Sequence, residues 1–148
     1  MKKKIATGIL GLAMVAGLST SAFAADSIFV YEHERNDTFS KANTFQLTNN
    51  VIISGNAFEG DKDYYRFAAP ETGSFKFDFG AANIDLPAGE AVVTLYDENE
   101  NKIRSKKVNS RNELIFTEDL VKGHKYYLKV ESTYTRSYDY LIWIDKQN

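Results

Sequence analysis

The sequence predicts an all-β protein, an antiparallel β-sandwich of about eight strands that follows a cleaved signal peptide. Beyond Asn43, aromatic and β-branched residues alternate with polar ones at period two, which is typical of strands with one buried face. Turn-forming residues separate these segments at fairly regular intervals. Few segments have the spacing of an amphipathic helix, so the pattern favours an all-β fold.

The leader has the composition of a secretory signal peptide, residues 1–24. Lys2, Lys3 and Lys4 form a basic start, residues 5–18 are apolar, and residues 22–24 supply the small residues of a cleavage site. A retained membrane helix would need about 20 apolar residues. We therefore expect cleavage after Ala24 and a secreted, extracellular product.

Removal of the leader leaves a mildly acidic chain. The remaining 124 residues carry 15 Lys and Arg against 20 Asp and Glu, a net charge of −5. This length fits one domain with an adequate core, and the charge disfavours a nucleic-acid partner, which requires a basic face. The chain has no cysteine, which excludes disulfides and a lipidated cysteine. We expect no membrane attachment after cleavage.

The strands can be placed in order from the alternation and the turns between them. Residues 25–43 form an N-terminal arm with one helical turn at 38–42, and residues 44–148 form the sandwich, a single domain with the arm. The expected strands cover residues 51–58, 63–68, 74–79, 91–96, 102–108, 113–117, 125–131 and 138–144. The expected turns lie at 56–60, 70–73, 97–101 and 122–124, and the longest irregular piece at 81–89.

Two short clusters of oxygen-bearing side chains are the most specific chemical signal. Residues 32–37 are Glu-His-Glu-Arg-Asn-Asp, and residues 60–65 are Gly-Asp-Lys-Asp-Tyr-Tyr. Carboxylate and amide oxygens are hard ligands, and Ca²⁺ binds about 6 to 8 of them from flexible, non-helical segments. In an extended arm Glu32, Glu34 and Asn36 would share one face. The two clusters together predict a calcium site.

The other expected donors flank these. Asp37 begins the helical turn and can reach the same ion, while Asp61 and Asp63 lie two residues apart at the start of a strand. Carboxylates gathered within a few ångströms repel one another unless a cation neutralises them. Simpler interpretations stay open, since acidic residues near an N-terminus are often solvated, Asn36 and Asp37 can cap a helical turn, and Gly60 with Asp61 can form a turn.

The order of motifs along the chain resembles a known family. Between residues 32 and 144 the chain carries Glu-x-Glu-x-Asn-Asp, Gly-Asp-x-Asp-Tyr-Tyr-x-Phe, Leu-Tyr-Asp-Glu-Asn, Gly-x-x-Tyr-Tyr-Leu-x-Val and Tyr-x-Ile-x-Ile. This order is similar to that of the bacterial pre-peptidase C-terminal domain, a group that includes the collagen-binding domains of clostridial collagenases. The resemblance implies a jelly-roll-like β-sandwich with a calcium-clamped N-terminal segment. Such domains are non-catalytic and are usually appended to secreted peptidases.

Transferred residue by residue, the resemblance implies six calcium ligands: Glu32, Glu34, Asn36, Asp37, Asp61 and Asp63. The second cluster departs from the family pattern, because the collagen-binding members space its two aspartates three residues apart and this chain spaces them two apart. Asp61 therefore matches less well than Asp63. These members also place tyrosines just after the Tyr-Tyr-Leu-x-Val strand, where this chain has Glu131 and Thr133. Collagen is thus one option among several extracellular polymers.

Enzymatic interpretations find little support in the sequence. The chain has only two histidines, His33 and His124, no cysteine nucleophile and no phosphate-binding glycine loop. The strongest catalytic alternative is a glycoside hydrolase with paired carboxylates. Its two acids would be Asp61 and Asp63, or Glu32 and Glu34. Neighbouring acids on loops are usually equally solvated, whereas catalytic pairs need environments that separate their pKa values.

A binding face is expected from the aromatic residues of the last two strands. Alternation directs Tyr126, Leu128 and Val130 inward, and likewise Tyr140, Ile142 and Ile144. If the two strands are neighbours, the outward residues Tyr127, Leu141 and Trp143 form an apolar patch of the kind that marks interaction sites. The alternative is that loops or the arm cover this patch.

The sequence therefore predicts a secreted, calcium-stabilised, non-catalytic module that binds an extracellular polymer or protein. Two roles are compatible with this: a free-standing adhesin-like binder, or a partner, inhibitor or chaperone-like subunit of a separately encoded secreted peptidase. The paired-carboxylate hydrolase is the minority alternative.

Overall fold

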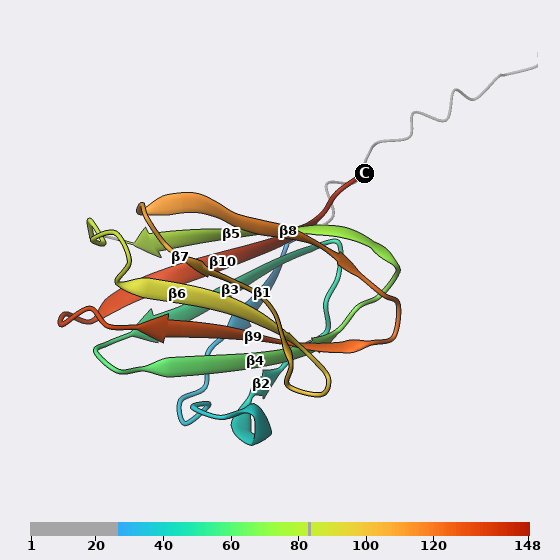
Figure 1. Ribbon diagram of the computed structural model, residues 1–148, viewed down its shortest axis with the longest axis horizontal. Coiled ribbons are helices and arrows are strands. Elements are labelled where there is room, and N and C mark those ends of the chain that lie inside the picture. The colour runs from blue at the N-terminus through green and yellow to red at the C-terminus, as the bar shows by residue number, and fades with distance from the viewer. Residues whose placement is uncertain (1–26, 83) are drawn as a thin grey trace, which may run out of the picture.

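The computed structural model describes residues 27–82 and 84–148 as two β-sheets packed face to face (Figure 1). The expected signal peptide, residues 1–24, lies outside the described residues. No helix in the described ranges is long and apolar enough to cross a membrane.

Each sheet has five strands. The first sheet contains, in spatial order, β1 (Ile28–Tyr31), β3 (Asn50–Ala57), β10 (Tyr138–Lys146), β5 (Gly73–Ala82) and β8 (Asn112–Leu120). The second contains β2 (Asn43–Thr44), β4 (Lys62–Ala68), β9 (Lys125–Ser132), β6 (Ala91–Asp97) and β7 (Lys102–Lys107). A 3₁₀ turn, η1 (Phe39–Lys41), lies between β1 and β2.

The β-sandwich prediction is confirmed. All eight expected strands are present with bounds close to those expected, and η1 is the helical turn expected at 38–42. The two further strands, β1 and β2, both belong to the arm. They have four and two residues, too few for an alternating pattern to indicate them.

The expectation of purely antiparallel sheets is wrong for the arm. β1 pairs with β3 in parallel, and β2 pairs with β4 in parallel, so both sheets are mixed. The reason is the path of the chain, which alternates between the sheets. Because the segment between β1 and β3 crosses to the other sheet as β2, the chain returns to the same end and enters β3 in the direction of β1.

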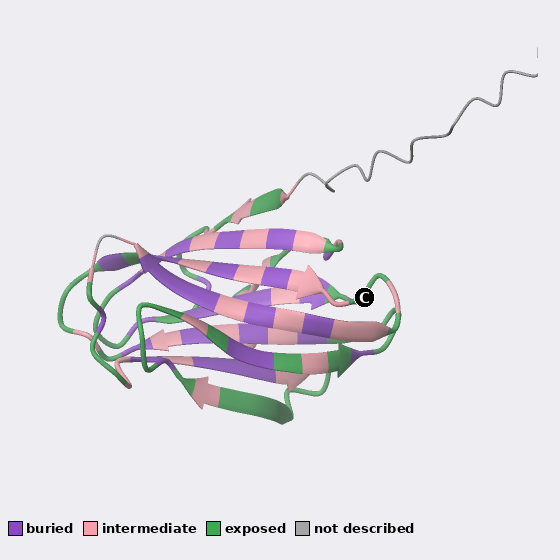
Figure 2. Ribbon diagram, turned by 90° about the horizontal axis from the view of Figure 1, so that it is seen from above, coloured by how far each residue is buried: buried purple, intermediate pink, exposed green. Residues whose placement is uncertain are grey.

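The core lies between the two sheets and is built by alternation along the strands. Buried residues alternate with partly exposed ones along β3, β9 and β10, visible as bands in Figure 2. The inward residues expected from the sequence are all buried: Tyr126, Leu128, Val130, Tyr140, Ile142 and Ile144. Phe75, Phe77 and Phe79 of β5 fill the centre of the first sheet's inner face.

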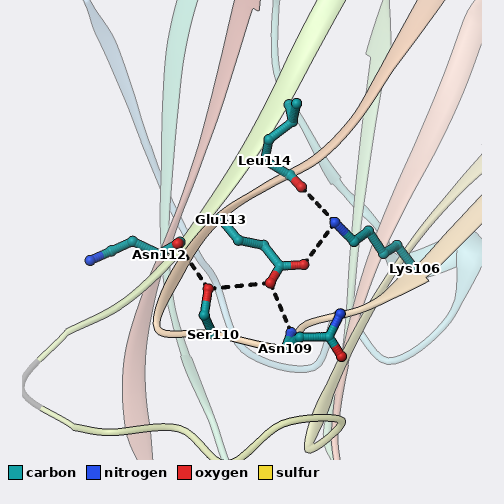
Figure 3. Close-up of polar contacts among 6 residues, drawn as sticks. All are labelled: Lys106, Asn109, Ser110, Asn112, Glu113 and Leu114. Carbon is teal, nitrogen blue, oxygen red and sulfur yellow. Dashed lines mark hydrogen bonds and ion pairs between the residues drawn. The ribbon is translucent and has the colours of Figure 1, made fainter.

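One open side of the sandwich is closed by polar contacts between β7 and the loop and first residues of β8 (Figure 3). Lys106 Nζ lies 2.8 Å from Glu113 Oε1 and donates to the Leu114 carbonyl at 2.8 Å. Burial alone would raise the pKa of Glu113, but the hydrogen bonds from Lys106 and the Asn109 backbone outweigh it and lower that pKa. These contacts join the two sheets away from the acidic clusters.

Candidate metal centre

The two acidic clusters meet where the arm crosses the sandwich between β1 and η1. The Glu32 backbone N–H donates to the Ser54 carbonyl of β3 at 2.9 Å, and the Tyr64 N–H of β4 donates to the Asn36 carbonyl at 3.0 Å. Asn43 closes the loop of the arm, since its Oδ1 accepts from the His33 N–H at 2.8 Å and its Nδ2 donates to the His33 carbonyl at 3.0 Å. The arm is therefore fastened to both sheets by backbone contacts.

The backbone between these contacts is not extended. Arg35 has a φ of 74°, in the left-handed region, so the alternation that would place Glu32, Glu34 and Asn36 on one face does not hold. Asn36 is fully buried, whereas Glu34 is exposed and its Oε2 accepts from the Arg35 N–H at 3.3 Å. Asp37 is also exposed. The predicted geometry of a regular strand is wrong, although the clusters do converge.

The second cluster is placed by a turn and by the end of β9. Gly60 has a φ of 81°, which a glycine adopts without strain, and its N–H donates to the Ser132 carbonyl at 2.9 Å. The Ser132 N–H in turn donates to the Asp61 carbonyl at 3.1 Å. Asp61 and Asp63 then point inward with 4% and 1% of their surface exposed. Two carboxylates are thus held in the interior by backbone geometry.

Four buried oxygens of this site have no hydrogen-bond partner. They are Glu32 Oε1, Asn36 Oδ1, Asp61 Oδ2 and Asp63 Oδ1, four of the seven such side-chain atoms in the described part of the chain. A buried oxygen without a donor typically costs about 1–3 kcal/mol, and more when it is charged. The structure thus gathers unsatisfied hard acceptors from both clusters.

Burial and the neighbouring carboxylates raise the pKa values of both aspartates. Burial, then the nearby charge of Glu34, and also those of Glu32 and Asp37, raise the pKa of Asp61 from 3.8 to about 6, although the Lys62 N–H opposes this. Burial and the adjoining Glu32 carboxyl raise the pKa of Asp63 to about 10. Carboxylates held this close together repel one another unless a cation neutralises them.

The site has a second wall that the sequence did not reveal. The Tyr140 hydroxyl donates to Asp63 Oδ2 at 2.8 Å, and Tyr65 Oη lies 2.6 Å from Tyr140 Oη. The remaining Glu32 oxygen, Oε2, accepts from the Asn56 N–H at 2.8 Å. Tyr140 and Asn56 therefore orient the acids, and Tyr65 of the second cluster contacts Tyr140. No local motif links Tyr140 or Asn56 to the clusters.

The carboxylate and amide oxygens of the site are of the kind that binds calcium. In their present conformations, however, these side chains do not surround a common point. Within residues 27–82 and 84–148, no group of three or more His, Cys, Asp or Glu side chains is arranged to hold a metal. Glu32 is turned toward Asp63, and Glu34 toward the backbone N–H of Arg35. Small rotations of these carboxylates would be needed to direct them to a common ion, and Asn36 adds an amide oxygen.

The structure separates the predicted surface patch into two parts. β9 and β10 lie in different sheets, so Tyr127 cannot share a face with Leu141 and Trp143, and that prediction is wrong. Tyr127 packs edge-on against Phe39 of η1, with ring centroids 5.1 Å apart. Leu141 and Trp143 remain partly exposed on the outer face of the first sheet.

Comparisons with known proteins support the fold. No family model and no curated protein matches the sequence. The pre-peptidase C-terminal domain of a collagenase from Bacillus anthracis superposes with a TM-score of 0.55 at 21% identity, covering 70% of this chain and 94% of that one. A periplasmic inhibitor of g-type lysozyme, PliG from Aeromonas hydrophila, has a TM-score of 0.50 at 10% identity, covering 82% and 99% of the two chains. The chain therefore has the fold of the pre-peptidase C-terminal domain, as the sequence resemblance implied.

Proposed function

We propose that this chain is an exported, non-catalytic interaction module whose N-terminal arm is fastened to the sandwich by a calcium ion. The observation that carries the proposal is the set of four buried, unpartnered oxygens contributed by Glu32, Asn36, Asp61 and Asp63. Hard oxygen donors that lack a hydrogen bond and repel one another are what a divalent cation satisfies.

The buried donors would hold the ion, and the exposed acids would complete its shell. Glu32, Asn36, Asp61 and Asp63 supply oxygens from inside the site, while Glu34 and Asp37 lie at its solvent edge, close enough to raise the pKa of Asp61. Bound calcium supplies a positive charge that removes the repulsion among these carboxylates. Tyr140 and the Asn56 N–H keep Asp63 and Glu32 oriented through their second oxygens.

Calcium binding at this position would stabilise the whole arm. The donors come from the arm and from the turn and first residues of β4, so an ion between them links β1 and η1 to the second sheet. A ligand that binds only the folded form stabilises it by about 2.7 kcal/mol at a free concentration ~100 times its dissociation constant. Extracellular modules bind calcium with constants on the order of 10⁻⁴ to 10⁻³ M, so binding would follow export.

The geometry argues against the aspartate pair as the acids of a glycoside hydrolase. Asp61 and Asp63 are 4% and 1% exposed, so neither can flank a glycosidic bond of a polymer. Both Asp63 oxygens point into the protein, one to Tyr140 and the other toward Glu32. These acids belong to the interior of the fold and not to an open cleft.

A second candidate is an inhibitor or partner of a separately encoded secreted enzyme. The likeness of fold to the Aeromonas hydrophila inhibitor of g-type lysozyme supports it, because that fold is used there without catalysis. Binding assays with insoluble collagen, chitin and peptidoglycan, and with a g-type lysozyme, each run with and without calcium, separate the two roles.

Thermal unfolding of the mature chain tests the calcium proposal. We expect the midpoint to rise when millimolar calcium replaces a chelator, and Asp63→Asn to abolish that rise. Asp63→Asn should also raise the calcium-free midpoint at neutral pH, because Asp63 must take up a proton on folding there, whereas the amide is neutral and its oxygen can still accept from Tyr140. Asp119→Asn, an exposed acid of β8 away from the site, serves as the control and should keep the full response. Equal midpoints of the wild type in calcium and chelator would refute the proposal.

A further inference from the structure

The outer face of the first sheet carries a band of apolar side chains aligned across its strands. Phe29 of β1 stands opposite Ile52 of β3, which stands opposite Trp143 of β10. In the next row Tyr31 stands opposite Ser54, which stands opposite Leu141. Strands lie about 4.8 Å apart, so each row is continuous across the strands and the two rows adjoin. We call these five apolar residues (Phe29, Tyr31, Ile52, Leu141 and Trp143) the aromatic face.

Two residues of the aromatic face are exposed, and the other three are half-buried. Phe29 and Tyr31 are 54% and 65% exposed, and their rings lie nearly parallel with centroids 6.3 Å apart. Trp143 lies down against Gly80 of β5, where a Cβ would stand 2.7 Å from the indole ring. The glycine therefore lets the largest side chain of the face rest on the sheet, and Gly80 is buried beneath it.

The charges around the aromatic face are mostly negative. The outward charged residues of β10 and β5 are Asp139, Asp145, Asp78 and Lys76. Lys76 Nζ lies 2.8 Å from Asp78 Oδ2, so this lysine is already paired. The outward residues of β3, on the other side of β10, add no charge. Asp139 and Asp145 thus leave a net negative rim.

We propose that the aromatic face docks a basic surface of another exported protein, one that presents an apolar side chain among Lys or Arg residues. Interfaces of this kind combine an aromatic centre with a charged rim, and contiguous exposed apolar surface on a sheet marks an interaction site. A second copy of this chain is a poor occupant, because two acidic rims would face each other on a protein whose expected mature net charge is −5.

This inference rests on the proposed function as an interaction module and names its surface and the chemistry of its partner. The arm contributes two of the five residues, since Phe29 and Tyr31 lie on β1, directly before Glu32. Leu141 and Trp143 lie on β10, so their position does not depend on whether the arm is fastened. The docking surface is therefore partly built by the segment that the acidic site fastens.

Selection of a random dodecapeptide library displayed on phage against the immobilised mature chain tests the proposal. We expect the enriched peptides to combine Lys or Arg with an aromatic residue, and to bind Phe29→Ser/Tyr31→Ser about tenfold more weakly than the wild type. Both positions are exposed, so this variant should fold. Asp139→Asn/Asp145→Asn should weaken the same peptides and lessen their preference for basic residues. Phe58→Ser, another exposed aromatic outside the face, is the matched control and should bind normally.

Peptides without basic residues, or peptides that bind the Phe29→Ser/Tyr31→Ser variant as well as the wild type, would overturn the proposal. Retention on chitin or peptidoglycan that depends on Tyr31 and Trp143 would overturn it in favour of a glycan. If the selection fails while calcium still raises the midpoint of unfolding, only the docking surface is wrong. If calcium has no effect while the selection succeeds, only the calcium proposal is wrong.

Discussion

Gly55 lies directly against the phenol of Tyr140, so close that a Cβ at position 55 would stand 2.5 Å from the Tyr140 hydroxyl oxygen. The two residues are opposite each other on β3 and β10, and both point into the core. The same Cβ would lie 2.9 Å from Glu32 Oε2. The absence of a side chain at Gly55 therefore allows Tyr140 to reach Asp63 and Glu32 to enter the acidic site.

Replacement of Gly55 by alanine should disturb both contacts. We expect Gly55→Ala to lower the free energy of unfolding by about 1–3 kcal/mol, the usual cost of overpacking a core, and to reduce the rise in midpoint produced by calcium. Urea titration with and without calcium measures both effects. Gly73→Ala is the matched control, because a Cβ there would meet only the flexible Lys146 side chain at 3.4 Å. Equal losses in the two variants would show that Gly55 has no special role.

The pH dependence of stability without calcium follows from the raised pKa values. Asp61 has a pKa of about 6 and Asp63 of about 10 in the folded chain, against an ordinary value of 3.8. The folded chain therefore binds more protons than the unfolded chain between these values, and stability falls as pH rises from about 4 through neutrality. Unfolding by urea in calcium-free buffers should show a lower midpoint at neutral pH than at mildly acidic pH.

Calcium should cancel this loss, because it favours the ionised form of every carboxylate it contacts. The same titration in calcium should give a midpoint that holds or rises between mildly acidic and neutral pH. Asp63→Asn should weaken the calcium-free dependence, since it removes the group with the larger shift. A calcium-free midpoint that rises with pH would contradict the assignment of Asp61 and Asp63 as crowded, buried acids.

Asn43 is predicted to hold the arm by bonding both the N–H and the carbonyl of His33. Asn43→Ala should remove both bonds and increase hydrogen exchange of the amides of β1, while the amides of β10 stay protected. Each lost hydrogen bond is worth about 0.5–1.5 kcal/mol, so the domain should remain folded. Asn99→Ala, in the exposed turn after β6, provides the comparison and should leave β1 unchanged. Unaltered exchange of β1 in Asn43→Ala would contradict the prediction.

The sequence predicts the strands well because alternation is a local property, and it predicts the acidic clusters because their residues are adjacent. It does not predict Tyr140 as a partner of Asp63, since the two residues are 77 positions apart and no spacing rule connects them. Gly55 is inconspicuous for the same reason, as its role depends on a ring from another strand.

Local sequence patterns also do not determine which strands are neighbours in a sheet. β9 and β10 are consecutive in the chain, and a direct hairpin between them would have joined Tyr127 to Trp143. The chain instead crosses from one sheet to the other between these strands. Trp143 was correctly expected on an outward face, but its neighbours are Ile52 and Asp78 and not Tyr127.

Trp143 is the only tryptophan of the chain, so its fluorescence reports on the aromatic face alone. Because it is partly exposed, acrylamide should quench it, and calcium should change that quenching little, since the acidic site lies on the opposite, inward side of β10. A basic peptide from the library selection should protect the indole and shift its emission to shorter wavelength. Asp139→Asn/Asp145→Asn should weaken this shift, whereas Asp97→Asn, an acid of the second sheet, should leave it intact. Equal protection of the indole in Asp139→Asn/Asp145→Asn and in Asp97→Asn would mean that the negative rim does not attract the peptide. The aromatic rings would then bind the peptide without a contribution from charge.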